Sequence, residues 1–150
     1  MRIIRMKKLI LASAALLALA ACTTDSNDDY KCNVSRTGNS VTLSESYKGE
    51  SYLESRTVYQ DEYGYYYSYI NTVYTMGSAA AAAEVCDDEK MEARHWKDGS
   101  YGVECYGNTV SVTQYDDGGL SSLDEAAYDY QSICDDGFRR EKNGTLDDDF

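Results

Sequence analysis

Alternating apolar and polar residues dominate the chain between residues 31 and 115, and glycine-containing turns interrupt the alternation. Gly38-Asn39 and Gly107-Asn108 suit tight hairpin turns, because both residue types tolerate positive φ and β-branched residues alternate after each pair. Asp61 to Gly64 and Lys97 to Gly99 are further turn signals. The pattern therefore predicts strands over 31–36, 40–47, 52–60, 65–75, 90–96, 100–106 and 109–115.

Two other segments have helical spacing. Ser122 and Glu125 have the spacing of a capping box. After Ser122, one helical face contains Leu123, Ala126, Ala127, Tyr130, Ile133 and Cys134. Gly137 is expected to end this helix. An earlier helix over about 77–88 has a narrow face that would let it lie very close to a sheet, made of Ala79, Ala82, Ala83 and Cys86.

The same order of elements occurs twice along the chain. Gly38 to Leu43 parallels Gly107 to Val112, each has a cysteine upstream, and each is followed by a helical stretch that ends in Cys-Asp-Asp. This order indicates an internal ββα-type duplication, although the unequal spacings also allow a chance similarity. With or without duplication, the elements predict an α+β fold, in which two helices pack on an antiparallel sheet.

The first residues follow a different pattern from the rest of the chain. Residues 1–8 contain four basic side chains and no acidic one, and residues 9–21 are apolar apart from Ser13. This layout is typical of a secretory signal, and the apolar run is short for a membrane span. The segment ends in Leu19-Ala20-Ala21-Cys22, which resembles the lipobox of bacterial lipoproteins.

In that class, a diacylglyceryl group is attached to the cysteine and a peptidase cuts just before it. The resemblance implies that lipid on Cys22 anchors the protein to a membrane. Because Thr23 stands where aspartate tends to cause retention at the inner membrane, the resemblance also implies sorting to the outer membrane. The expected organisation is a signal peptide at 1–21, a lipidated tether at 22–29, one disulfide-stabilised domain at 30–138 and a flexible acidic tail at 139–150.

The charge of the processed chain limits its partners. Four of the 14 Lys and Arg residues precede residue 22 and none of the 26 Asp and Glu residues does, so the remaining chain has a net charge of −16. Binding to a phosphate backbone requires clustered Lys and Arg. The composition therefore excludes a nucleic-acid partner, and it disfavours adhesion to anionic lipid head groups.

The other cysteines are Cys32, Cys86, Cys105 and Cys134, an even number that suits export to an oxidising compartment. No Cys-x-x-Cys pair indicates a redox site, and one histidine with widely spaced cysteines gives a weak zinc signal. Two disulfides are predicted, and the sequence allows three connectivities. Pairing within each repeat favours Cys32–Cys86 and Cys105–Cys134.

Tyrosine is the most unusual feature of the composition, with 15 residues. Tyr63, Tyr65, Tyr67 and Tyr69 share one face of the predicted strand. If that face is open, the rings would form a flat ladder that can stack on sugar rings or dock against a protein. The alternative is structural, because tyrosine is a good strand former that covers sheet surfaces.

No recognisable catalytic motif, cofactor motif or calcium loop occurs in the chain. His95 and Trp96 would point to opposite faces of the predicted strand, so no catalytic or metal-binding residue is assigned. The sequence therefore predicts a non-catalytic binding or structural component of the cell envelope, with envelope proteins or polysaccharide as its partners. A lipid-anchored hydrolase acting on polysaccharide and an accessory subunit of an outer-membrane complex are the alternatives.

Overall fold

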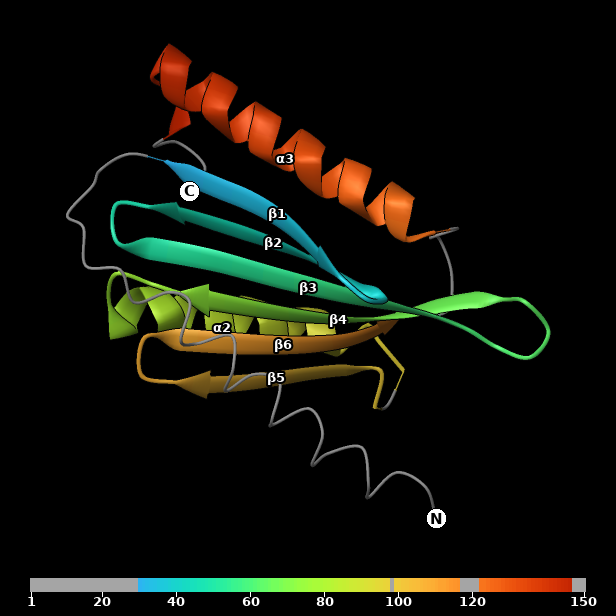
Figure 1. Cartoon of the computed structure of the whole chain (residues 1–150). Coiled ribbons are helices and arrows are strands. Elements are labelled where there is room, and N and C mark those ends of the chain that lie inside the picture. Colours follow the sequence, from blue (N-terminus) through green and yellow to red (C-terminus); the bar gives the residue numbers. More distant parts are fainter. Residues whose placement is uncertain (1–29, 98, 117–121, 147–150) are drawn as a thin grey trace.

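The α+β fold predicted from the sequence is confirmed by a computed structural model that describes residues 30–97, 99–116 and 122–146. Its six strands form one antiparallel sheet in the order β1-β2-β3-β4-β6-β5 (Figure 1). The predicted signal, tether and lipobox lie outside the described residues. The elements are β1 (Lys31–Thr37), β2 (Ser40–Tyr47), β3 (Glu50–Gln60), β4 (Tyr66–Thr75), α2 (Ala79–Ala93), β5 (Tyr101–Tyr106), β6 (Thr109–Asp116) and α3 (Leu123–Asn143).

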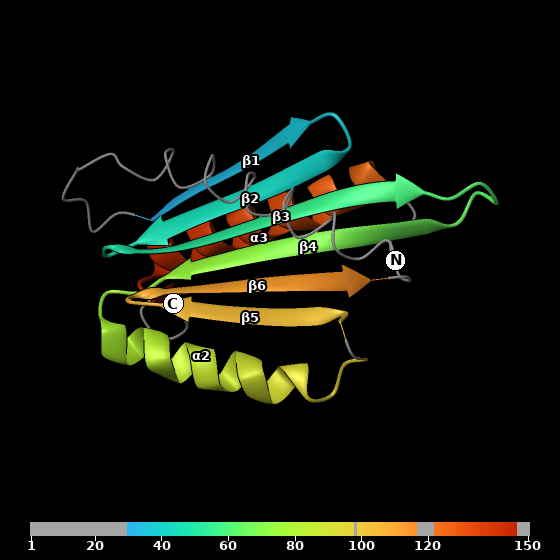
Figure 2. The same cartoon turned by 90° about the horizontal axis from the view of Figure 1, so that it is seen from below.

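Both helices lie on the same side of the sheet. The strand register places Leu43 of β2, Thr72 of β4 and Val112 of β6 in one row that faces the helices. Helix α3 covers β1 and β2, whereas α2 lies beside β5 and β6 (Figure 2). Strands β3 and β4 therefore form the floor between the two helices.

Two small hydrophobic clusters hold the helices to the sheet. Under α3, the cluster consists of Val41, Leu43, Ala126, Tyr130 and Cys134. Under α2, it consists of Ala82, Cys86, Val110 and Val112. Because large aliphatic side chains are few in both clusters, each helix gains only modest stabilisation from burial, and each is also attached to the sheet by a covalent bond.

The disulfides join Cys32 to Cys134 and Cys86 to Cys105, so the predicted pairing of Cys32–Cys86 and Cys105–Cys134 is wrong. The reason is that each helix packs on the hairpin of the other half of the chain. Helix α2 lies on the β5–β6 hairpin that follows it, and α3 returns to the β1–β2 hairpin. Each disulfide therefore ties a helix to an edge strand, and the duplication stays a prediction.

The strand predicted at 90–96 is also wrong, because α2 continues through Ala93. The buried face of α2 is formed by Ala82 and Cys86, while Ala79 and Ala83 are exposed. After the helix, the Trp96 ring packs 5.3 Å from the ring of Tyr101. His95 is exposed to solvent.

Helix α3 does not end at Gly137, but at Gly144, which has the left-handed φ of 68° that suits a C-cap. Gly137 is instead a packing position, since a Cβ there would lie 2.1 Å from the Tyr30 hydroxyl oxygen. The predicted domain boundary at residue 138 therefore moves. Residues 139–143 belong to α3, and Leu146 beyond the helix is buried.

Candidate functional site

The β3–β4 hairpin projects beyond its neighbouring strands and carries many of the tyrosines. Strand β2 pairs with β3 only as far as Thr57, and β6 pairs with β4 only as far as Ser68. Strands β3 and β4 continue to pair with each other up to Gln60 and Tyr66 (Figures 1 and 2). We call residues 58–68 the tyrosine arm.

The tip of the tyrosine arm is held in a defined turn. The Asp61 Oδ1 atom accepts hydrogen bonds from the backbone N–H groups of Tyr63 and Tyr65, both at 2.9 Å. The side-chain amide of Gln60 donates to the Gly64 carbonyl at 3.0 Å, and Gly64 has a φ of 87°. Because these bonds fix the backbone, the Tyr63 and Tyr65 side chains are presented to solvent, with 78% and 73% of their surface exposed.

Four tyrosine rings gather at the base of the arm, on the side of the sheet opposite the helices. The Tyr59 and Tyr67 rings are stacked at 5.3 Å with an interplanar angle of 13°. The Tyr69 ring stands nearly perpendicular to the Tyr59 ring, and the Tyr115 ring lies 5.1 Å from Tyr69. Three strands, β3, β4 and β6, therefore contribute to one aromatic cluster.

The structure supports part of the tyrosine prediction. Tyr67 and Tyr69 do share one face of β4, but Tyr63 and Tyr65 lie in the turn before the strand begins. The flat ladder is not formed, because the rings of the cluster are tilted against each other. Sequence reasoning missed Tyr59, although the turn at 61–64 places it directly across from Tyr67.

The aromatic cluster continues into a sheet surface that is uncharged on the four central strands, which we call the open face; the edge strands place Lys31 and Glu104 at its borders. Neither helix covers this side, and β2, β3, β4 and β6 direct only Ser, Thr, Asn, Tyr, Leu and Val side chains to it. One row across the sheet consists of Ser35, Thr42, Ser55, Asn71 and Thr113. In a chain with a net charge of −12, such a neutral surface is a distinct feature.

On the helix side, tyrosine hydroxyls are used differently, because they donate hydrogen bonds to partly buried carboxylates. Glu54 accepts from Tyr130 at 2.6 Å and also from Tyr52. Glu89 of α2 accepts from Tyr74 at 2.8 Å and also from Tyr101. Burial, together with these carboxylates, raises the pKa of each of the four phenols well above its ordinary value.

These four phenols are expected to make the folded protein less stable at alkaline pH. Since their pKa values are higher in the folded than in the unfolded protein, their contribution is complete below about pH 10 and is lost as the pH rises above it. We expect the free energy of unfolding to fall steeply above that pH, measured by urea denaturation at a series of pH values. Tyr130→Phe should make the fall less steep, and increasing stability above pH 10 would contradict the assignment.

The described residues give no indication of a metal site or of a membrane-spanning helix. No three His, Cys, Asp or Glu side chains lie together in a way that could hold a metal ion within that part of the chain. No helix there is long and apolar enough to span a bilayer. The Trp96 indole donates to Glu92 at 3.2 Å, so Trp96 and exposed His95 do not form a shared site.

The chain matches no protein-family model, no curated protein and no solved structure.

Proposed function

We propose that this protein is a non-catalytic binding module that lipid on Cys22 anchors in the bacterial cell envelope, in diderm bacteria at the outer membrane. The tyrosine arm and the open face would bind a neutral polysaccharide of the envelope or of the cell exterior. One observation carries the proposal: on β2, β3, β4 and β6, tyrosine, hydroxyl and small apolar side chains form a continuous uncharged surface on an otherwise strongly acidic chain, and the acidic residues of the arm, Asp61 and Glu62, lie at its tip.

The chemistry of this surface suits a neutral sugar polymer. Tyrosine rings pack against the apolar faces of sugar rings, and their hydroxyls can form hydrogen bonds with sugar hydroxyls. The serine, threonine and asparagine rows of the open face would add further donors and acceptors along the strands. Because no charged group on β2, β3, β4 or β6 has to lose its hydration there, binding would avoid a large desolvation cost.

The surroundings of the tyrosine arm favour binding over hydrolysis. Most glycosidases place two carboxyl groups on either side of the bond that is cleaved. The acidic side chains of the arm are Asp61 and Glu62, and Asp61 already accepts two backbone hydrogen bonds of the turn. The exposed Tyr63 and Tyr65 side chains lie on a projecting hairpin, which suits contact with an extended polymer.

Replacing Tyr59 and Tyr67 by alanine is expected to weaken polysaccharide binding by roughly tenfold or more, since each stacked ring contributes on the order of 1 kcal/mol. Co-sedimentation of the protein with insoluble envelope and extracellular polysaccharides would measure the loss. Tyr59→Phe and Tyr67→Phe keep the rings, so they should retain most of the binding.

Tyr128→Ala is a matched control, because its side chain is exposed on α3, on the opposite side of the sheet from the open face. This variant should bind like the unaltered protein. Equal loss in the control and arm variants, or no polysaccharide binding by the unaltered protein, would contradict the proposal. Capture of a defined envelope protein that depends on Tyr59 and Tyr67 would instead support an accessory-subunit role.

A further inference from the structure

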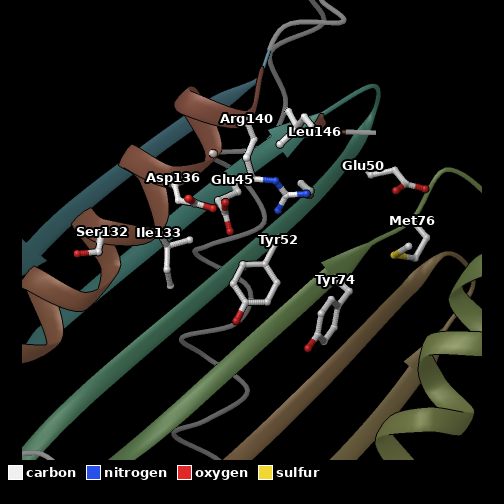
Figure 3. A pocket seen from close by; sticks show the side chains of 12 residues that line it. Glu45, Glu50, Tyr52, Tyr74, Met76, Ser132, Ile133, Asp136, Arg140 and Leu146 are labelled. Carbon is white, nitrogen blue, oxygen red and sulfur yellow. The ribbon is translucent and has the colours of Figure 1, made fainter. Parts of the chain in front are cut away.

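A cavity of about 480 Å³ lies on the helix side of the sheet, away from the tyrosine arm and the open face. It is bordered by the second half of α3 on one side and by the ends of β3 and β4 on the other (Figure 3). This volume is within the range that holds a small organic molecule. The tyrosine rings and charged side chains that line it belong to neither surface of the proposed function, so its ligand would be a separate one.

The floor and walls of the cavity are largely apolar. The Tyr52 and Tyr74 rings form the floor in an edge-to-face pair at 5.3 Å. Met76, Ile133 and Leu146 line the walls. Hydrogen bonds from Tyr74 to Glu89 and from Tyr52 to a second carboxylate hold both rings in place. The cavity is therefore formed before any ligand arrives, which lowers the entropic cost of binding.

The charged groups around the cavity are predominantly acidic. Glu45, Glu50 and Asp136 line it, and Arg140 is the one basic residue among the lining side chains. Outside the lining, Arg139 pairs with one oxygen of Asp136, and the Tyr30 hydroxyl donates to one oxygen of Glu45, so each carboxylate keeps its second oxygen for a ligand. The Glu50 Oε1 atom accepts a hydrogen bond from the Gly77 N–H at 3.0 Å, which fixes that carboxylate beside the aromatic floor. Carboxylates and the faces of tyrosine rings both attract cations.

We propose that this cavity binds a small organic cation, namely an amine with an apolar or aromatic body. The body would lie on Tyr52 and Tyr74, and the ammonium group would face Glu50 and Asp136. A carboxylate-bearing molecule of the same shape would be repelled by the same side chains. The observation that carries the proposal is the combination of an apolar aromatic floor with three carboxylates around one cavity.

Three probes of similar shape test which ligand charge the cavity prefers: phenethylamine is a cation, phenethyl alcohol is neutral and phenylacetate is an anion. They would be titrated into the full-length protein in detergent, with the methionine methyl groups labelled with carbon-13 for NMR. Met76 lines the cavity, whereas Met91 is exposed on α2 and reports non-specific effects. We expect phenethylamine to shift the Met76 signal saturably without shifting that of Met91, and the other two probes to bind at least tenfold more weakly.

The double variant Glu50→Gln and Asp136→Asn is expected to weaken phenethylamine binding about tenfold. The double variant Glu84→Gln and Asp88→Asn removes the same charge from the exposed side of α2, outside the cavity, and should leave binding unchanged. Equal binding of the three probes to the unaltered protein would overturn the proposal, as would equal weakening in both double variants. If the protein binds no polysaccharide through Tyr59 and Tyr67, the result for the cavity is unaffected. The two proposals can therefore fail separately.

Discussion

Replacing Cys22 with serine is expected to move the protein from the membrane fraction to the soluble fraction. Serine has no thiol for the lipid, and the apolar residues before it are too few to span a bilayer comfortably. Each buried methylene of an acyl chain contributes about 0.8 kcal/mol, so loss of two or more chains removes nearly all membrane affinity. Fractionation of cells and mass spectrometry of the N-terminal peptide would measure the change.

Cys105→Ser is a suitable control for the anchor, because it also removes a thiol but leaves residues 1–29 unchanged. This variant should remain in the membrane fraction and carry the lipid mass. An unmodified thiol on Cys22 in the unaltered protein would refute the anchor. A serine variant that stays bound to membranes after washing with high salt would refute it as well, since salt removes proteins held by charge alone.

The second large effect is expected from removing the Cys32–Cys134 disulfide. This bond closes a loop with a sequence separation of 102, while Cys86–Cys105 has a separation of 19. The chain-entropy model gives about 4.7 kcal/mol for a loop of ~100 residues and about 3 kcal/mol for one of ~15. Against a typical domain stability of roughly 5–15 kcal/mol, the longer loop could provide a third or more of the total.

Alanine at both positions of each disulfide provides the comparison. We expect the midpoint of thermal unfolding to fall by roughly 15 °C without Cys32–Cys134 and by roughly 10 °C without Cys86–Cys105, measured by circular dichroism. Peptide mapping without reduction should first identify the two bonds. A larger fall for the Cys86–Cys105 variant would contradict the loop-length argument, and mapped Cys32–Cys86 would contradict the fold.

Local signals in the sequence were sufficient for most of the sheet. Strand β2 has the predicted bounds, and β1, β4, β5 and β6 differ from prediction by at most one residue at either end. The reason is that glycine turns and alternation are encoded within a few residues of each strand. The helix start at Ser122 was likewise predictable, because its hydroxyl accepts the Glu125 N–H as a capping box requires.

Features that depend on distant parts of the chain could not be predicted in the same way. Alternation between Met91 and Trp96 indicated a strand, but packing of α2 on the β5–β6 hairpin extends the helix through Ala93. Gly137 resembled a helix stop, whereas Tyr30 from the other end of the domain packs against it. The disulfide pairing was missed for the same reason, since it follows from which hairpin each helix covers.

The candidate site, like the fold, could be predicted from the sequence only where local signals determine it. Parity along one strand was enough to place Tyr67 and Tyr69 on a common face. The ring of Tyr115 joins them only because β6, and not β5, lies next to β4 in the sheet. The cavity between α3 and the floor strands had no sequence signal, because its lining residues are brought together from β2, β3, β4 and α3.

The bond between β1 and α3 also determines how the domain would bear tension. Cys32 lies ten residues after Cys22, so a pull on a chain anchored at Cys22 enters the fold at an edge strand. An edge strand alone would peel away one backbone hydrogen bond at a time. Here the Cys32–Cys134 bond would transfer the load from the second residue of β1 into helix α3, which packs on that strand. If lipid on Cys22 anchors the chain, tension would therefore load this covalent bond before β1 could detach alone.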